Sequence, residues 1–475
     1  MSYLCTMVRK APLFALGALL FSAVFFAGEA AQANGRFPAT NQLVFSPNPN
    51  VMALRATFGI LVTQDRGQNW DWSCEQAVPY AGIQDPSVGF TANGNLVMGV
   101  VEGVALTSDN ACNWSLQQGS LKFMVDTVVR PDAPHTMLAL QNYYVTADDA
   151  GNSIYQSQVY VSNDDGSTFA PLGVPLDPNY VLETLEVAPT DPNRIYVSGF
   201  TGQGASSKAS LFVSTDLGMH WSTYTIPFDP SVERAPFIAG VDPTSADRVY
   251  VRTSNAPGGK SRLYVTPDAG KTMQMVYSGI QLMGFAQSAD GSKVYLGGPF
   301  DGMLVADRSS LSFQQRSKQI IQCLTVHQGL LYACSAEGDD PDAGTKGGFA
   351  LGTSTDDGAT FTPILHLPCV RGPLSCAAGA SESACISLWQ VQSENLGEGY
   401  PHPGLCGASD AGLDATPDAS SPPPPRPAPP SGCGCVSAPA EASALGAAIS
   451  LGISWLLVAR RARSKRHVTH GRGKL

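Results

Sequence analysis

Hydrophobic and polar residues alternate along much of this chain in short runs, which Gly, Pro, Asn and Asp interrupt. Runs of this kind, rich in β-branched and aromatic residues, predict strands. Good examples lie at 193–197, 247–251, 292–296 and 330–333, and turns such as 189–192 precede some of them. The pattern therefore predicts a chain built from many short strands joined by turns.

A second pattern recurs downstream of these strands. It reads Ser or Thr, any residue, Asp, any residue, Gly, two residues, and then Trp or Phe. Four good copies carry Asp65, Gly67 and Trp70; Asp164, Gly166 and Phe169; Asp216, Gly218 and Trp221; and Asp356, Gly358 and Phe361. Two weaker copies carry Asp109 and Trp114, with Ala111 in the Gly position, and Asp268 and Gly270, with Met273 in the aromatic position. A seventh copy, Asp307 with Phe313 behind it, lacks the Gly and is counted by its position.

The residue types in this pattern predict a hairpin turn. Gly supplies the positive φ that a tight turn needs, and the Asp and Ser/Thr side chains can bond to backbone groups of the turn. The aromatic residue points back between sheets and buries a large apolar area. The Asp positions recur every 48 residues or so, which is about the length of a propeller blade. Seven units of four antiparallel strands predict an all-β fold, a closed seven-bladed β-propeller.

These turns resemble the Asp-box, or BNR repeat, of sialidases, sortilin-type receptors, certain endoglucanases and the photosystem II assembly factor. The resemblance extends over about residues 42–365. It implies the propeller fold. It does not imply one function, because the box is shared by enzymes, receptors and scaffolds.

Composition and charge bear on partners and destination. Only 14% of the residues are charged, and the formal net charge is −10. Nine of the 29 basic residues lie in the N-terminal leader or after Ala459, so the remaining body is strongly acidic. An acidic body argues against a nucleic-acid partner.

Both ends of the chain carry export signals. Arg9 and Lys10, an uncharged apolar run over 11–27 and the small residues at 31–33 predict a signal peptide at 1–33. Residues 409–432 form a Pro-rich stretch that predicts a disordered linker. An uncharged segment at 442–459 is just long enough for a transmembrane helix, and the basic residues after it predict a cytoplasmic tail.

The segment 433–475, with Cys433 and Cys435 ahead of the apolar run and the Arg cluster, resembles the C-terminal sorting signals of myxobacterial surface proteins. The resemblance implies a membrane protease that cuts near the cysteines and releases the protein to the cell surface. The alternative is a permanent single-pass anchor. Either way, we expect the body of a bacterial protein outside the inner membrane, on the cell surface or secreted.

Eight cysteines lie in the exported body, an even number that predicts disulfides in an oxidising compartment. They are Cys74, Cys112, Cys323, Cys334, Cys369, Cys376, Cys385 and Cys406. Cys323 and Cys334 bracket two neighbouring strands and can pair; the other pairings stay open. We expect the Cys-rich segment 366–408 to close the ring, with a strand over 386–391. A zinc site is the alternative for its four cysteines, but their spacing does not match usual zinc-ligand pairs.

No catalytic constellation stands out. A sialidase needs an arginine triad and a Tyr nucleophile assisted by an acid. Arg36 belongs to a weak match to that family's opening motif, and Arg55, Arg130, Arg234, Arg252 and Arg371 cannot be placed around one pocket. No carboxylate pair for glycoside hydrolysis can be singled out. The histidines at 135, 220, 327, 366 and 402 have no metal spacing, and the acidic loops at 148–152 and 339–342 predict solvated loops better than Ca²⁺ sites.

The sequence thus predicts an exported propeller without cofactor or metal. We expect a non-catalytic binding or scaffold module for a protein or a polysaccharide. The alternative is a glycoside hydrolase of the sialidase-like type.

Overall fold

The structure is a computed structural model, and it describes residues 37–78, 84–117, 121–397 and 406. The predicted signal peptide, the Pro-rich linker, the transmembrane segment, Cys433 and Cys435 lie outside these residues, as do Arg36 and His402. The described residues contain no helix that is both long and apolar enough to span a bilayer.

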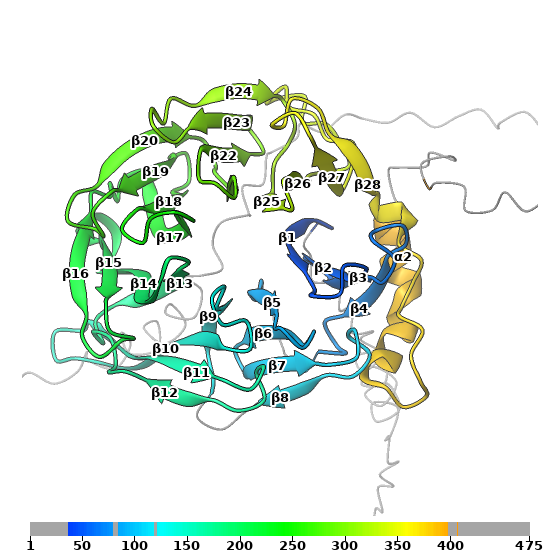
Figure 1. Cartoon of the computed structure of the whole chain (residues 1–475), viewed down its shortest axis with the longest axis horizontal. Coiled ribbons are helices and arrows are strands. Elements are labelled where there is room, and N and C mark those ends of the chain that lie inside the picture. The colour runs from blue at the N-terminus through cyan, green and yellow to red at the C-terminus, as the bar shows by residue number, and fades with distance from the viewer. Residues whose placement is uncertain (1–36, 79–83, 118–120, 398–405, 407–475) are drawn as a thin grey trace, which may run out of the picture. The chain divides into compact units, whose positions relative to one another are not determined.

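Seven four-stranded antiparallel sheets form the blades of a propeller (Figure 1), which confirms the predicted fold class. The first blade comprises β1 (Thr40–Phe45), β2 (Met52–Ala56), β3 (Gly59–Thr63) and β4 (Asp71–Cys74). The second comprises β5 (Val88–Phe90), β6 (Leu96–Val100), β7 (Gly103–Thr107) and β8 (Ser115–Gln117). The third comprises β9 (Met124–Val129), β10 (Met137–Ala147), β11 (Ser153–Ser162) and β12 (Ala170–Leu172).

The remaining blades repeat this plan. The fourth comprises β13 (Val181–Ala188), β14 (Asp191–Thr201), β15 (Lys208–Ser214) and β16 (Ser222–Ile226), with a short 3-10 turn, η1 (Gly204–Ser206), between β14 and β15. The fifth comprises β17 (Glu233–Val241), β18 (Val249–Asn255), β19 (Ser261–Thr266) and β20 (Gln274–Gly279). The sixth comprises β21 (Gly284–Gln287), β22 (Lys293–Gly298), β23 (Gly302–Asp307) and β24 (Gln314–Ser317). The seventh comprises β25 (Cys323–His327), β26 (Leu330–Cys334), β27 (Leu351–Ser354) and β28 (Thr362–Leu365).

The order of strands defines two ends of the ring. Because each sheet runs in sequence order and every pair is antiparallel, all turns between third and fourth strands lie at one end. We call this end the box face. The turns between second and third strands lie at the other end, together with the connections between blades, and we call it the hairpin face. The first strand of each blade lies innermost and contacts the first strand of the next blade around the ring.

The core lies between neighbouring blades. Middle strands are buried on both sides and read as continuous apolar runs, as β3 and β6 do. Tyr196, Phe212 and Tyr250 are among the largest fully buried side chains. The outermost strands are more polar, because one of their edges faces solvent; β24 is largely exposed. Successive side chains of a strand therefore point in turn toward the two neighbouring blades, which accounts for the alternation seen in the sequence.

The ring closes without any exchange of strands between its first and last blades, because every blade is built from one continuous stretch of chain. At this seam Phe45 of β1 stacks on His327 of β25, with ring centroids 3.8 Å apart, and the Thr40 hydroxyl donates to the carbonyl of Ala350 at 2.7 Å. Packing and a few hydrogen bonds therefore hold the seam, together with the segment that follows β28.

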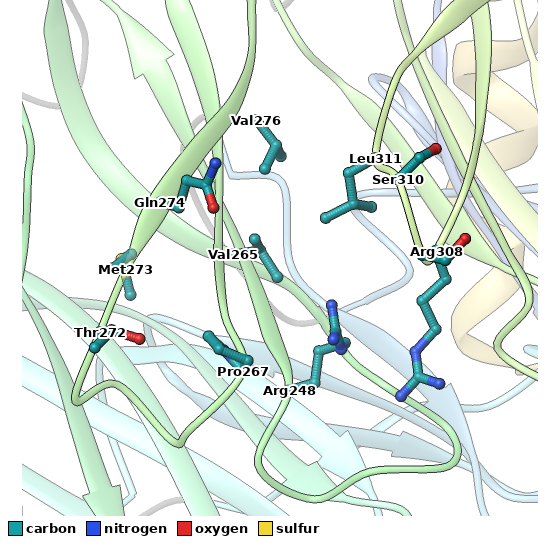
Figure 2. A pocket seen from close by; sticks show the side chains of 11 residues that line it. Arg248, Val265, Pro267, Thr272, Met273, Gln274, Val276, Arg308, Ser310 and Leu311 are labelled. Atoms are coloured by element: carbon teal, nitrogen blue, oxygen red, sulfur yellow. The ribbon is translucent and has the colours of Figure 1, made fainter.

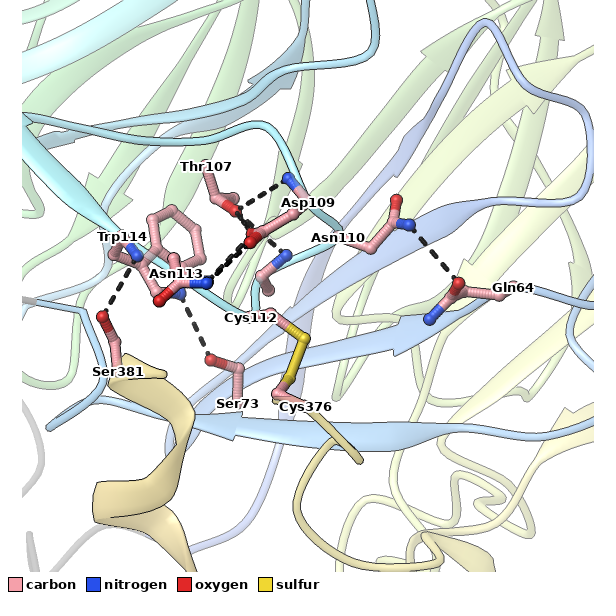
Figure 3. The surroundings of a disulfide bond; sticks show 11 residues. Gln64, Ser73, Thr107, Asp109, Asn110, Cys112, Asn113, Trp114, Cys376 and Ser381 are labelled. Carbon is pink, nitrogen blue, oxygen red and sulfur yellow. Dashed lines mark hydrogen bonds between the residues drawn. A yellow bond between two sulfur atoms is a disulfide. The ribbon is translucent and has the colours of Figure 1, made fainter. Parts of the chain in front are cut away.

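That segment crosses from the seventh blade to the first two blades. It comprises η2 (Leu367–Cys369), η3 (Ser381–Leu388) and α2 (Trp389–Gly397). Two disulfides tie it back, Cys74–Cys385 to the first blade and Cys112–Cys376 to the second. We call residues 366–397, with these two disulfides, the clasp. Figure 3 shows Cys112–Cys376 beside the Ser381 hydroxyl, which accepts from the Trp114 backbone at 3.2 Å.

All eight body cysteines are paired. Cys323 and Cys334 are joined between adjacent strands, as the sequence suggested, and Cys369 is joined to Cys406. The four cysteines of the segment 366–408 are thus bound to sulfur and are not free to be zinc ligands. Four disulfides indicate an extracellular or otherwise oxidising compartment.

The predicted strand over 386–391 is wrong, because these residues are helical in η3 and α2. The reason is that the outer edge of β4 is already occupied. The Trp72 N–H donates to the carbonyl of Gly372 at 2.7 Å, and the Leu374 N–H donates to the carbonyl of Trp72 at 3.1 Å. No ladder position is left on β4, and Ile386 and Val391 remain exposed.

Candidate functional site

The box residues form the corners of the blades at the box face. In the first blade the Asp65 carboxylate accepts from the Thr63 hydroxyl at 2.8 Å and from the Asn69 N–H at 2.9 Å. The Gly67 N–H donates to the Thr63 hydroxyl at 2.9 Å, and Trp70 is buried against the next element. The Thr63 and Asp65 side chains thus satisfy backbone groups of their own turn.

The same hydrogen bonds recur at the corners that contain Asp109, Asp164, Asp216, Asp268 and Asp356. The corner at Asp307 differs: its backbone carbonyl accepts from the N–H groups of Ser310 and Leu311 and from the Ser310 hydroxyl. Hydrogen bonds from the side chain and then the backbone of His220 lower the pKa of Asp216 to about 2. The backbone and then the side chain of Thr360 do the same for Asp356. These carboxylates are structural and are poorly suited to proton transfer near neutral pH.

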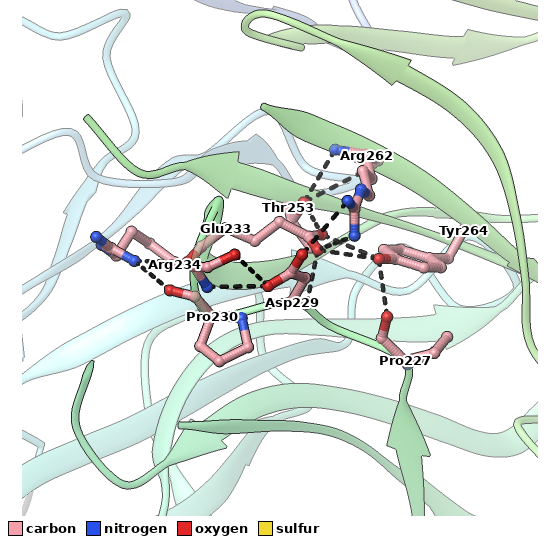
Figure 4. A network of polar contacts seen from close by, with 9 residues as sticks. Pro227, Asp229, Pro230, Glu233, Arg234, Thr253, Arg262 and Tyr264 are labelled. Atoms are coloured by element: carbon pink, nitrogen blue, oxygen red, sulfur yellow. Dashed lines mark hydrogen bonds and ion pairs between the residues drawn. The ribbon is translucent and has the colours of Figure 1, made fainter. Parts of the chain in front are cut away.

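A Tyr and an acid do lie together, as the sialidase alternative requires, but they are buried within the fifth blade (Figure 4). The Tyr264 hydroxyl donates to both Glu233 carboxylate oxygens at 3.1 Å. Glu233 also accepts from Thr253 at 2.7 Å and from Arg262 at 2.9 Å, and both Glu233 and Tyr264 have at most 1% of their surface exposed. Burial raises the pKa of Tyr264 to about 12. A nucleophilic Tyr needs the opposite shift and access to substrate.

The arginines considered for a carboxylate-binding triad are not brought together. Arg130 pairs with Asp132 and Arg371 with Asp71 on the outer strand β4. Arg234 donates to the carbonyls of Pro230 and Glu233. Arg55 donates to the carbonyls of Asp85 and Pro86 at 2.8 Å. Arg252 lies over the ring of Phe237, 4.8 Å from its centroid.

The described histidines and acidic loops serve local contacts. His135 and His220 pair with Asp165 and Asp216, His366 pairs with Glu337, and burial lowers the pKa of His327. Asp148 accepts from the N–H groups of Ala150 and Asn152, and Asp339 pairs with Lys346. Within the residues that the structure describes, no group of three or more His, Cys, Asp or Glu could hold a metal ion.

The innermost strands carry three carboxyl groups that the sequence did not single out, and the sequence had named only Arg252 of the charged residues considered with them. Asp126 lies on β9, Glu183 and Glu186 on β13, and Arg252 on β18. Arg252 also lines a cavity of about 250 Å³, together with residues that include Gln42 and Phe285. The Asp126 carboxylate accepts from the Leu185 N–H at 2.8 Å, which links the third and fourth blades.

Protein surrounds the carboxyl groups of Asp126, Glu183 and Glu186, and this burial raises their pKa values. The pKa of Asp126 rises to about 6, and that of Glu183 to about 8 against the pull of Arg252. Burial and then the charge of Asp126 raise the pKa of Glu186 to about 8. Burial lowers the pKa of Arg252 to about 10. Near neutral pH, therefore, Glu186 is protonated and Asp126, whose charge acts on Glu186, is ionised.

The signal that could have revealed this cluster is the run from Val181 to Ala188. Two acids, Glu183 and Glu186, interrupt a largely apolar strand there and are half-buried. The sequence alone cannot separate such positions from exposed ones, because β13 is recognisable as an innermost strand only once the ring has closed.

The hairpin face carries a second feature, a long β-hairpin in the third blade. Strands β10 and β11 have 11 and 10 residues, and their outer halves project past their neighbours (Figure 1). Tyr144 and Tyr155 face each other across the strands with centroids 6.2 Å apart, and Phe123 stacks on Tyr143 at 5.5 Å. Tyr144 is 55% exposed, Val145 53% and Phe123 42%. We call Phe123, Tyr143, Tyr144 and Tyr155 the aromatic hairpin.

Polar contacts hold the aromatic hairpin in place. The Tyr143 hydroxyl donates to the Gln156 amide oxygen at 2.7 Å, and the Lys122 ammonium lies 4.5 Å from the centre of the Tyr143 ring. Tyr144 and Tyr155 lie on one face of the hairpin, and Tyr143 points to the opposite face with Phe123 against it, because successive side chains of a strand alternate. Exposed aromatic groups with a polar border are typical of binding surfaces. The sequence contained this signal as Tyr143-Tyr144, but an exposed Tyr in a strand cannot be told from a buried one before the neighbours of the strand are known.

Comparison with known proteins supports the fold. Residues 157–298 match the family model described as Sortilin-Vps10 (Sortilin, neurotensin receptor 3), so part of the propeller is sortilin-like. This match covers less than a third of the chain. A comparison with curated protein sequences gave no match.

Among solved structures, an ancestral GH74 enzyme aligns with 14% identity and a TM-score of 0.46 over 69% of this chain and 45% of that one. Hydrazine synthase of Kuenenia stuttgartiensis aligns with 10% identity and a TM-score of 0.46 over 65% and 95%. Sqt1 of Saccharomyces cerevisiae aligns with 13% identity and a TM-score of 0.42 over 69% and 85%. The chain thus spans less than half the length of the ancestral GH74 enzyme. Resemblances of this strength do not identify a function.

Proposed function

We propose that this protein is a non-catalytic binding module of the bacterial cell surface that holds a polysaccharide on its aromatic hairpin. The observation that carries the proposal is the exposed aromatic hairpin at the hairpin face. Flat aromatic rings stack against the C–H faces of sugar rings, and the neighbouring Gln156 and Lys122 offer hydrogen-bonding groups at the border. The Tyr side chains have few rotatable bonds, so little conformational entropy is lost on binding.

The charge of the body restricts the ligand. The chain has 39 acidic against 29 basic residues, and nine of the basic ones lie in the leader or the tail. A polyanion would be repelled over a range of about 8 to 10 Å at moderate salt. We therefore infer a neutral polysaccharide, and not an acidic one, as the ligand of the aromatic hairpin.

The proposal is tested by affinity electrophoresis of the full-length protein in gels that contain neutral glucans, xylans or mannans. Tyr144→Ala with Tyr155→Ala should weaken the retardation at least about tenfold, because two stacking surfaces are lost. Phe300→Ala is the matched control, since Phe300 is also exposed and lies in a turn at the hairpin face of another blade. Retardation that persists in the double variant would refute the site. Binding to a protein in place of every polysaccharide would refute the ligand class.

A second function is favoured by one observation, the separated pKa values of Glu186 and Asp126. A protonated and an ionised carboxyl group are the pair that a glycoside hydrolase uses as acid and base. Two observations weigh against a glycoside hydrolase. The Asp126 carboxylate already accepts two backbone N–H groups, from Thr127 and Leu185. Tyr264 and Glu233, the Tyr–acid pair that a sialidase-like mechanism would need, are buried.

Turnover of a panel of fluorogenic glycosides separates the two functions. We expect no turnover above background from the full-length protein. A steady rate that Glu186→Gln abolishes, while the rate survives Glu183→Gln, would identify a hydrolase and overturn the non-catalytic proposal.

A further inference from the structure

The interfaces between blades contain a repeated charged latch near the box face. In the fourth blade, Arg194 reaches Asp247 of the fifth blade at 2.6 Å. In the sixth blade, Lys293 pairs with Asp357 of the seventh blade, and the Tyr295 hydroxyl donates to the same carboxylate at 2.7 Å. Each latch therefore joins a basic residue at the start of a second strand to an acid of the following blade.

Between the fifth and sixth blades, an arginine occupies both positions of this latch. Arg248 occupies the position of Arg194 and Lys293, ahead of Tyr250 on β18. Arg308 follows Asp307 just as Asp357 follows Asp356, so an arginine stands where the next seam has an acid. Two guanidinium groups meet here in place of an opposite-charge pair.

One buried carboxylate is shared between the two arginines. Asp242 is fully buried, and one of its oxygens lies 2.6 Å from Arg308 Nε and 4.0 Å from Arg248 Nε. Its other oxygen accepts from the backbone and the hydroxyl of Thr244 at 2.9 and 2.8 Å. Two positive charges therefore face one negative charge. Arg308 meets Asp242 through Nε, and its terminal nitrogens have no acceptor among the residues that the structure describes.

The arginines form one end of a cavity of about 360 Å³. Figure 2 shows Arg248 and Arg308 converging there, while Val265, Pro267, Met273, Val276 and Leu311 supply apolar walls. The guanidinium groups are partly exposed, with 25% and 31% of their side-chain surface accessible, so a solute can reach them. A net positive charge at one end and an apolar wall at the other fit an anion that is attached to an apolar body.

We propose that the seam between the fifth and sixth blades binds a monocarboxylate with an apolar body. The carboxylate would lie against the terminal nitrogens of Arg308 and beside Arg248, and the apolar body would lie against Met273 and Leu311. The site is at the box face and shares no residue with the aromatic hairpin, so it stands or falls independently of polysaccharide binding.

Isothermal titration of the full-length protein at low salt tests the proposal with three probes. Octanoate should bind. Octanamide has the same body without the charge, and glucuronate has the charge on a polar body, so each should bind at least about tenfold more weakly. Equal binding of octanoate and octanamide would overturn the role of the arginines. Equal binding of octanoate and glucuronate would overturn the role of the apolar wall.

Two variants locate the site. Arg308→Asp places an acid at the position that Asp357 holds in the next seam and removes one guanidinium from the cavity, so octanoate binding should fall at least about tenfold. Arg248→Gln removes the second guanidinium and should weaken binding as well, which keeps the test valid if the first variant does not fold. Arg234→Gln removes one charge elsewhere and should leave the affinity unchanged. Undiminished octanoate binding in a folded Arg308→Asp or Arg248→Gln protein would refute the site.

Discussion

The clasp should carry much of the stability of the ring, because no shared strand joins the first blade to the seventh. The decisive perturbation is the removal of its disulfides in matched pairs. We consider Cys74→Ala with Cys385→Ala, Cys112→Ala with Cys376→Ala, and all four changes together. Alanine suits Cys74 and Cys385 because both side chains are fully buried, although the Cys74 N–H then loses the Cys385 Sγ that accepts from it at 3.0 Å.

The magnitude follows from the lengths of chain that the disulfides close. Alone, Cys74–Cys385 closes 311 residues and Cys112–Cys376 closes 264. When one of them is present, the other closes only the 38 residues from Cys74 to Cys112 and the nine from Cys376 to Cys385. In the chain-entropy account, loss of either one costs about 4 kcal/mol and loss of both costs about 10 kcal/mol. The loss of both should therefore exceed the sum of the single losses.

Guanidinium unfolding followed by Trp fluorescence measures these differences directly. Trp72 of the first blade and Trp389 of the clasp lie 5.6 Å apart, so their emission reports release of the clasp. Cys323→Ala with Cys334→Ala is the control, since that disulfide spans only 11 residues within the seventh blade and should cost about 3 kcal/mol. Hydrogen exchange should quicken in β1 and β25 of the clasp variants and not in those strands of the control.

Two results would refute this reasoning. One is a four-cysteine variant that is as stable as either two-cysteine variant. The other is unchanged exchange in β1 and β25 after the clasp disulfides are gone, because the seam would then hold through packing alone.

Three further outcomes follow from the box corners and from Glu186. Asp356→Ala should lower the free energy of unfolding by about 2 kcal/mol, because the Asp356 carboxylate accepts hydrogen bonds from Ser354 and Thr360 in the turn. Asp307→Ala should change the free energy of unfolding by less than about 0.5 kcal/mol, because Asp307 contributes its backbone carbonyl. Equal losses in urea unfolding would contradict the structural role of the box. Ala111→Gly should raise stability by about 1 kcal/mol, since Ala111 holds a φ of 73° that the other intact corners give to Gly, and a lower Tm would count against this. The raised pKa of Glu186 means that the folded protein binds this proton more tightly than the unfolded chain does, so the contribution of Glu186 to stability should be greatest below about pH 4.5 and fall as the pH approaches 8. Glu186→Gln should raise the Tm at pH 8 by about 3 °C and reduce the loss of stability between about pH 4.5 and 8. A variant whose stability changes with pH in parallel with that of the wild type would disprove the raised pKa.

The sequence by itself determined the blades. The period of the box, its turn residues and the alternating strands act over a few neighbouring residues, and hydrogen bonds such as Thr63 to Asp65 are local. Local interactions recur wherever the same short sequence recurs, so seven sequence units predicted seven blades. The weakness of the seventh copy was visible for the same reason, since at Asp307 the backbone carbonyl accepts the bonds of the turn.

Only the tertiary structure decided what the ring brings together. Cys74 and Cys385 are 311 residues apart, and the outer edge of β4 is taken by residues that no local pattern ties to it, which is why the strand expected over 386–391 is helical. Glu186 and Asp126 come from different blades, as do Arg248 and Arg308. Contacts between distant segments depend on the angle at which complete blades pack, and that angle is a property of the closed ring and not of any stretch of residues.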